Sequence, residues 1–194
     1  MPSNLSRILS YGSVVLYDDD LLLLQDGEWL NDRLITFATE YLMDQLNSDE
    51  REQVEVLCPS TCEMLKFSPD AMTWLSLLVF VREDCQFYYM DSLTNADSSA
   101  AIQIMNNASR HLCPGEKPRL HKTVCPRQEN CYDCGLLVIE FVRFILTHGL
   151  HSPTKALKML AETRMDASFI RECRSNWKNI ILEQARIHRL EKHN

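Results

Sequence analysis

The sequence predicts an α+β protein in which helices pack around a small mixed or antiparallel sheet. In residues 29–46, apolar side chains recur every three or four positions, the spacing of a helix with one buried face. Two short runs, "TWLSLLVFV" (73–81) and "QFYYMDS" (86–92), are rich in β-branched and aromatic residues and read as strands. The run "CGLLVIEFVRFILT" (134–147) is apolar on nearly all sides, which is typical of a central, buried helix.

The remaining elements follow in chain order. Residues 9–25 combine a short strand with an acidic turn, and residues 50–66 suggest a short strand followed by a helix. The tetrapeptide "REDC" (82–85) is short enough to be the loop of a hairpin. Helices are expected at 98–112, 152–164 and 166–190, and a further strand at "HKTVCP" (121–126). Expected helix caps are Asn31 or Asp32 for the first long helix and Asp166 or Ser168 for the last.

Composition limits the class of protein. A chain of 194 residues suits one domain, 1–194, with 45% apolar and 24% charged residues. The net charge of −7 argues against nucleic-acid binding, and no apolar run approaches the roughly 20 residues that span a bilayer. The first twenty residues contain no secretory signal, so we expect a cytoplasmic or nuclear protein whose eight cysteines are reduced thiols.

Cys134 is the candidate nucleophile. It begins the buried helix, where the positive end of the helix dipole favours the thiolate. Acyl transfer by cysteine also needs a histidine base, a group that orients it and an oxyanion hole. Gln128 can supply an N–H to that hole, and Asp91, at the end of a strand, can orient a histidine. The alternative is that Cys134 is only a buried thiol, since free cysteine is among the most buried residue types.

The cysteines allow two other interpretations. Cys131 and Cys134 have the spacing of a redox pair, and together with Cys58 and Cys62 they could form a four-thiolate zinc site. Against zinc, three residues separate Cys58 from Cys62, and neither pair is flanked by a glycine-rich knuckle. Against a redox pair, no thioredoxin-like βαβ pattern surrounds it.

Four blocks, in order along the chain, carry a family resemblance. They are "EWLNDRLITFATEYL" (28–42), "LSLLVF" (75–80) followed by "FYYMDS" (87–92), "QENCYDCG" (128–135) and "NWKNII" (176–181). The chain resembles the ubiquitin-like-protein-specific cysteine proteases, which process SUMO and NEDD8, and is most similar to the NEDD8-specific branch, the deneddylases. The resemblance implies a papain-like cysteine-protease fold of the ubiquitin-like-protease type, with no metal and no cofactor.

By position, the resemblance assigns roles to five residues. Cys134 matches the nucleophile, Gln128 the oxyanion-hole glutamine, and Asp91 the aspartate that orients the histidine. Trp29 matches an aromatic wall of the tunnel that grips the Gly-Gly tail of the modifier. Asp32 matches an acidic residue that faces an arginine near that tail. Without the family, Trp29 reads equally well as a staple ahead of a helix, and Asp32 as its cap.

The histidine is where the chain departs from the family. The family has His-Trp directly ahead of the "SLLV" strand, whereas this chain reads "MTWLS" (72–76). Aligned without a gap, Trp74 occupies the histidine position; with a one-residue insertion, which needs a bulge, Thr73 does. The six histidines are at positions 111, 121, 148, 151, 188 and 193, all outside this segment.

The segment just upstream is also shorter than in the family. A buried strand and a long loop precede the histidine there, whereas "KFSPDA" (66–71) leads almost directly to Thr73. We therefore expect one family strand to be lacking. The expected function is a cysteine protease that cleaves after the C-terminal Gly-Gly of a modifier, with NEDD8 the first choice and SUMO the second. The alternative is a pseudoprotease that binds the modifier without cleaving it.

Overall fold

The computed structural model describes residues 6–59, 62, 76–93 and 98–191. The chain opens with a hairpin of β1 (Arg7–Tyr11) and β2 (Val14–Tyr17). Gly12 in its turn has φ of +48°, and an added Cβ would lie 2.1 Å from a carboxylate oxygen of Glu40. The turn therefore requires glycine both for its backbone conformation and for the close approach of α1.

A short 3-10 helix and two helices follow the hairpin. They are η1 (Leu22–Leu24), α1 (Asp32–Asp44) and α2 (Ser48–Arg51). Asn31 caps α1, because its side chain accepts a hydrogen bond from the N–H of Leu34. The buried positions of α1 are Leu34, Ile35, Phe37, Ala38 and Thr39, and the helix packs against α5 and β2.

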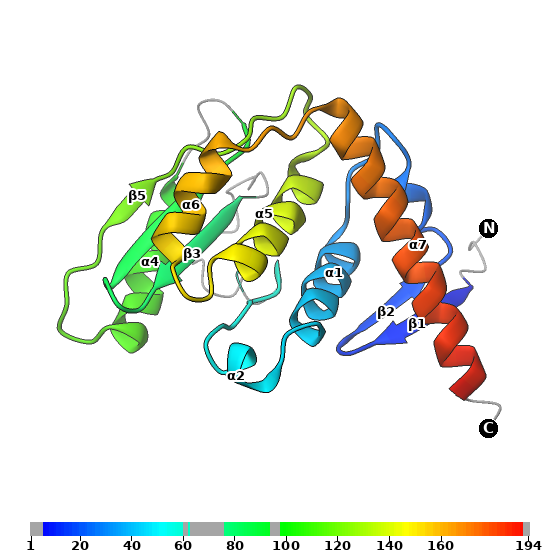
Figure 1. The fold of residues 1–194 in the computed structure, drawn as a ribbon, viewed down its shortest axis with the longest axis horizontal. Coiled ribbons are helices and arrows are strands. Elements are labelled where there is room, and N and C mark those ends of the chain that lie inside the picture. The colour runs from blue at the N-terminus through cyan, green and yellow to red at the C-terminus, as the bar shows by residue number, and fades with distance from the viewer. Residues whose placement is uncertain (1–5, 60–61, 63–75, 94–97, 192–194) are drawn as a thin grey trace.

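The second sheet is mixed, as the sequence predicted. Strands β3 (Leu77–Val81) and β4 (Gln86–Met90) are antiparallel, with Leu77 opposite Met90, and the short β5 (Leu120–Lys122) pairs in parallel with β4. The loop 82–85 closes the hairpin. Helix α4 (Ser99–Leu112) lies beside this sheet (Figure 1).

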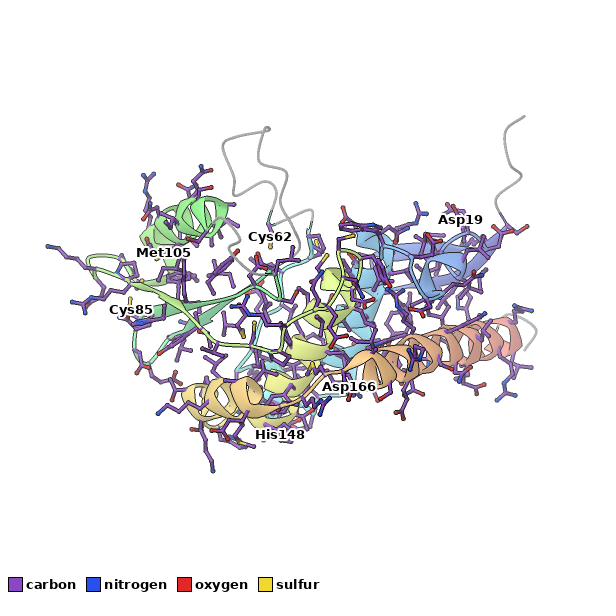
Figure 2. The ribbon with its side chains drawn as sticks, turned by 90° about the horizontal axis from the view of Figure 1, so that it is seen from above. Asp19, Cys62, Cys85, Met105, His148 and Asp166 are labelled. Carbon is purple, nitrogen blue, oxygen red and sulfur yellow. The ribbon has the colours of Figure 1, made fainter. Side chains whose placement is uncertain are left out.

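Three helices complete the fold, namely α5 (Cys134–His148), α6 (Pro153–Glu162) and α7 (Ala167–Glu191). Helix α5 is central and contacts α1, α6, α7 and β3. Figure 1 shows α7 running along the side of the molecule that carries the β1–β2 hairpin. Figure 2 shows Asp19 beside that hairpin at one end, and Met105 and Cys85 beside the three-stranded sheet at the other.

Three local predictions need correction. Residues 54–58 form no strand, whereas residues 59 and 62, the described residues of the expected helix, are helical. The strand predicted over 73–81 is formed at Leu77–Val81, and residues 73–75 lie outside the described residues. The strand expected at 121–126 is only Leu120–Lys122, although the Thr123 N–H beyond it still donates to the Tyr89 carbonyl of β4 at 2.8 Å. In the described part of the chain, no helix is long and apolar enough to cross a membrane.

Candidate active site

Cys134 is the first residue of α5, where the sequence placed it. Its side chain is 1% exposed, and the helix behind it is almost wholly buried. The residue before it, Asp133, is the N-cap of α5. The amino end of a buried helix favours negative charge, so this position suits a thiolate nucleophile.

Asp91 follows the last residue of β4 and is also buried. Its carboxylate accepts hydrogen bonds from the Tyr89 hydroxyl, at 2.7 Å, and from the Leu93 N–H, at 2.8 Å. Its backbone carbonyl accepts from the Cys125 thiol, at 3.2 Å, and from the Arg127 guanidinium, at 3.1 Å. These contacts hold Asp91 against the segment that leads to Gln128 and Cys134.

Gln128 is fixed at the end of the same strand. Its backbone N–H donates to the Ser92 carbonyl at 3.1 Å, and its side-chain oxygen accepts from the Ser92 hydroxyl. Its side-chain N–H donates to the Asn130 carbonyl at 2.6 Å. The side-chain nitrogen of Gln128 carries two N–H groups. This contact uses one of them, and the predicted oxyanion-hole role needs the other.

Asn130 connects Gln128 to the residue before the nucleophile. Its side-chain N–H donates to Asp133 Oδ2 at 2.6 Å, and its Oδ1 accepts from the backbone N–H groups of Tyr132 and Asp133, at 3.0 Å each. A continuous series of hydrogen bonds therefore runs from Ser92, next to Asp91, to the amino end of α5. The structure brings the segments of Asp91, Gln128 and Cys134 together.

Arg174 of α7 joins the Trp29 segment to this group. Its Nη2 donates to the Glu28 carbonyl at 2.8 Å and to Asp133 Oδ1 at 2.6 Å. Glu28 precedes Trp29, and Asp133 precedes Cys134. Because one nitrogen binds both acceptors, the chain segments that carry the predicted tunnel wall and the predicted nucleophile lie side by side.

Trp29 and Asp32 lie on the surface at the start of α1. Trp29 is 45% exposed and Asp32 is exposed. Asp32 is inside the helix and Asn31 is the cap, so the interpretation of Asp32 as the cap is wrong. An exposed Asp32 carboxylate is in the state that pairing with an arginine of a partner requires.

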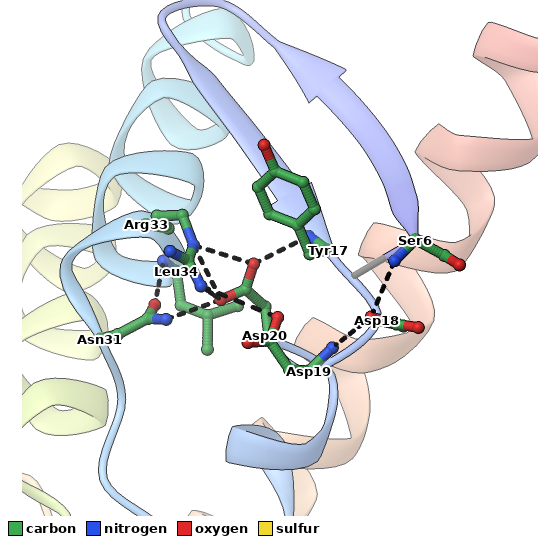
Figure 3. Close-up of polar contacts among 8 residues, drawn as sticks. All are labelled: Ser6, Tyr17, Asp18, Asp19, Asp20, Asn31, Arg33 and Leu34. Carbon is green, nitrogen blue, oxygen red and sulfur yellow. Dashed lines mark hydrogen bonds and ion pairs between the residues drawn. The ribbon is translucent and has the colours of Figure 1, made fainter. Parts of the chain in front are cut away.

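The Asp20 side chain lies between the end of β2 and the start of α1 (Figure 3). Its carboxylate is fully buried and accepts from Asn31 Nδ2 at 2.6 Å, from Arg33 Nη2 at 2.7 Å and from the Tyr17 N–H at 2.8 Å. The end of β2 is thereby tied to the first turn of α1. The acidic turn predicted for residues 9–25 thus contains one aspartate that fixes the first turn of α1, which carries Asp32.

The described histidines lie in other parts of the fold. His148 is the last residue of α5, a helix of 15 residues, so it is about 21 Å along the axis from Cys134. His121 lies on β5, where its ring stacks on Tyr88 and its Nε2 is 2.8 Å from Gln86 Oε1. His188 lies roughly four turns beyond Arg174 in α7. Thr73 and Trp74, the two residues predicted to occupy the histidine position, lie outside the described residues.

The alternative readings of the cysteines receive no support. Among the described residues, no group of three or more His, Cys, Asp or Glu side chains is placed to hold a metal ion, which argues against the four-thiolate zinc site. None of the eight cysteines is in a disulfide, so Cys131, which is exposed, and Cys134, which is buried, are not joined to each other.

Asp133, Asn130 and Arg174 were not predicted from the sequence. Asn130 and Asp133 lie within the "QENCYDCG" block, but only the structure identifies their partners. Arg174 offered a signal, since it falls on the apolar stripe of α7. That stripe consists of Ile170, Cys173, Trp177 and Ile181, all buried. An arginine at a core position of a helix is expected to have buried acceptors.

The chain is similar to proteins of known family. A family model described as Peptidase_C48, the Ulp1 protease family, C-terminal catalytic domain, matches residues 70–176. Sentrin-specific protease 8 of Homo sapiens is 26% identical over an alignment of 211 positions, which covers 92% of this chain and 98% of the relative. NEDD8-specific protease 1 of Arabidopsis thaliana is 28% identical over 171 residues, which cover 72% and 75%.

Solved structures share the fold. A de-sumoylating protease matches with a TM-score of 0.70 and 16% identity, covering 100% of this chain and 96% of its own. The C-terminal Ulp1 protease domain, in complex with Smt3, the yeast ortholog of SUMO, matches with a TM-score of 0.61 and 17% identity, covering 93% and 89%. The alignment with the human relative is longer than the 194 residues of this chain, so that relative has residues that this chain lacks.

Proposed function

Because the chain belongs to the Ulp1 protease family, we propose that it binds the Gly-Gly tail of a ubiquitin-like modifier, with NEDD8 preferred over SUMO, and cleaves after it. The relative named NEDD8-specific protease 1 supports the choice of NEDD8. The observation that carries the proposal is the network in which Arg174, Asp133, Asn130 and Gln128 join the segments of Trp29, Cys134 and Asp91.

In this proposal, Cys134 attacks the carbonyl carbon of the last glycine as a thiolate. The developing oxyanion is stabilised by an N–H of Gln128 and by backbone N–H groups at the amino end of α5. The thioester is then hydrolysed, and the modifier is released with a free carboxylate. A general acid must protonate the leaving amine, and in the family this is the histidine that Asp91 would orient.

A second candidate is a pseudoprotease that binds the modifier without cutting it. The sequence "MTWLS" (72–76) favours it, because no histidine stands at the family position. An ordinary thiol has a pKa of about 8.5, so only a few per cent is thiolate at neutral pH. Removing the histidine from a serine protease costs on the order of 10⁶ in kcat, and the leaving amine here would lack its donor as well.

Two measurements separate these candidates. NEDD8 carrying a C-terminal vinyl sulfone should label the protein at Cys134, and Cys134→Ala should abolish the labelling. Titration calorimetry should detect binding of unmodified NEDD8 to both forms. Binding without labelling identifies the pseudoprotease. If none of NEDD8, SUMO and ubiquitin binds, both candidates are wrong.

The Asp32 carboxylate gives a sharper test of the binding mode. Asp32→Ala should weaken NEDD8 binding by about 1–3 kcal/mol, since an exposed carboxylate would lose its arginine partner on the modifier. Asp49→Ala is the matched control, because Asp49 is an acidic residue in the first turn of α2, another exposed helix. Equal losses in calorimetry for the two variants would show that overall charge, not the proposed pair, contributes to binding.

A further inference from the structure

Asp133 is an N-cap residue that does not cap its helix. Aspartate at this position ordinarily accepts a hydrogen bond from the backbone N–H of the second or third helical residue. The side chain of Asp133 makes no such bond to α5. Its carboxylate is instead held on both sides, with Oδ1 bound by Arg174 and Oδ2 by Asn130, at 2.6 Å each.

The ion pair with Arg174 is itself buried. The side chains of Arg174 and Asp133 are 2% and 6% exposed. A charge is seldom buried in a protein unless it is paired, so each of these side chains depends on the other. A carboxylate left alone beside Cys134 would also repel the thiolate and oppose the positive end of α5.

We propose that Arg174 is a positioning residue, which sets the reactivity of Cys134 by holding the Asp133 carboxylate away from the amino end of α5 and neutralising its charge. The inference rests on the proposed role of Cys134 as nucleophile. The amino end of α5, to which the Asp133 side chain makes no cap bond, then stabilises the thiolate and, during the reaction, the oxyanion. This role concerns the thiol itself and does not depend on whether the chain has a histidine.

The geometry requires arginine. Besides the two acceptors of Nη2, Nη1 donates to the carbonyls of Leu23, at 3.0 Å, and Gln25, at 2.9 Å. Four acceptors from two distant segments surround one planar group. Lysine has three donors on a single nitrogen and cannot span this arrangement. The same side chain therefore fixes the loop ahead of Trp29 and the charge beside Cys134.

The test is the pH profile of Cys134 alkylation by iodoacetamide. Alkylation rates are followed by mass spectrometry of tryptic peptides. The protein carries Cys131→Ala, because trypsin cleaves after Arg127 and Arg143 and would otherwise leave Cys131 and Cys134 in one peptide. Each profile is normalised to its high-pH plateau, so that differences in access to the thiol cancel. Arg174→Met should move the midpoint of the profile upward by about one pH unit, because an unpaired carboxylate then faces the thiolate.

Asp133→Asn should move the midpoint in the opposite direction, because it removes the negative charge and leaves the guanidinium uncompensated. The double variant, Asp133→Asn with Arg174→Met, should return to within a few tenths of a unit of the parent, since it carries neither charge. Arg171→Met is the control, because it removes an exposed cation one turn away on the same helix. A purely structural role for Arg174 would give no such rescue.

The outcome is decisive whether or not cleavage is detectable. If folded Arg174→Met and Asp133→Asn both keep the parental midpoint, or if the double variant stays shifted like Arg174→Met, the proposal is wrong. If Arg174→Met fails to fold by circular dichroism, Asp133→Asn decides alone, with a downward shift supporting the proposal and an unchanged midpoint refuting it. Because no modifier is present, failure here leaves the proposed binding of NEDD8 to be judged by calorimetry.

Discussion

Asp91 and Asp133 are both buried aspartates beside the candidate nucleophile, and their partners give them different properties. Asp91 accepts from neutral donors, the Tyr89 hydroxyl and the Leu93 N–H. Its negative charge thus stays available to a cationic partner such as an imidazolium. Asp133 is paired with the Arg174 guanidinium, so its charge is neutralised locally. Residue type alone does not distinguish the two roles.

Introducing a histidine at the family position should increase cleavage. Trp74→His places an imidazole at the family position if the alignment has no gap, and Thr73→His does so if it has one insertion. We expect Trp74→His to raise cleavage of a fluorogenic NEDD8 substrate by at least about 100-fold over the parent, the usual contribution of a general acid–base. Thr73→His is the matched control for the register.

Other results of this experiment would each point to a different cause of low activity. Rescue by Thr73→His alone would establish the alignment with the insertion. Failure of both variants, in protein that binds NEDD8, would mean that the shortened segment ahead of residue 73 misplaces the site, since about 1 Å of displacement can cost two orders of magnitude. Equal activity in the parent and both variants would show that the chain has a base elsewhere.

Cys173 should make stability fall at alkaline pH. Burial, together with the neighbouring Glu140 carboxylate, raises the pKa of the Cys173 thiol to about 12. In the unfolded chain this pKa is about 8.5, so between these values the folded form keeps a proton that the unfolded form loses. The free energy of unfolding should therefore decrease as pH rises through this window.

Urea unfolding of the reduced protein from about pH 8.5 to 10.5 tests this, since Cys173→Ala removes the titrating group and should flatten the slope. Cys131→Ala is the control for loss of an exposed thiol. The same slope in Cys173→Ala as in the parent would exclude Cys173 as a source of the pH dependence.

The junction of β2 with α1 is the element that presents Trp29 and Asp32. Asn31 both caps α1 and donates to Asp20, so helix entry and hairpin exit share one residue. Arg33, in the first turn of α1, donates to the same carboxylate through Nε and Nη2. Asp32, between these two residues, is therefore held in place from both sides, as the proposed tail-binding role requires.

Asp20→Ala should cost about 3 kcal/mol of unfolding free energy, because the side chains of Asn31 and Arg33 lose a fully buried, charged acceptor. Chemical denaturation measures the loss. Asp19→Ala is the matched control, since this neighbouring carboxylate is 46% exposed and lies 3.7 Å from Arg33. It should cost no more than about 1 kcal/mol, the range of an exposed ion pair. A similar cost for both variants would contradict the structural role assigned to Asp20.

The last helix, α7, contacts elements from both ends of the chain. Helix α7 packs against β1, η1 and α5, so it joins the hairpin end of the chain to the nucleophile helix. Its buried stripe includes Trp177, whose Nε1 donates to the buried Glu140 of α5 at 2.9 Å. Contacts between residues so far apart in sequence form only when the whole domain folds.

Ile181→Ala should lower the unfolding free energy by about 2–5 kcal/mol, because the side chain is fully buried and its removal leaves a cavity between α7 and its neighbours. Leu182→Ala is the control at the next position, where the side chain is 43% exposed, and should cost under about 0.5 kcal/mol. Urea denaturation followed by circular dichroism measures both. Equal effects would mean that α7 is not docked as described.

The sequence by itself determined the elements that repeat a local pattern. The periodic apolar positions of α1, α5 and α7 predicted those helices, and the start of α5 at Cys134 followed from the run of apolar residues after it. The positions of Cys134 at the start of α5 and of Asp91 at the end of β4 were also predicted, because each lies at the boundary of a strongly patterned element.

Only the tertiary structure decided how the site is assembled. The choice of Asn31 over Asp32 as the cap depends on Asp20, and the placement of Arg174 depends on backbone carbonyls about 150 residues away in sequence. No local pattern encodes such partners, because they exist only once α7 has docked against the hairpin and α5. The charge that surrounds Cys134 is therefore a property of the folded chain, set by a residue from its last helix.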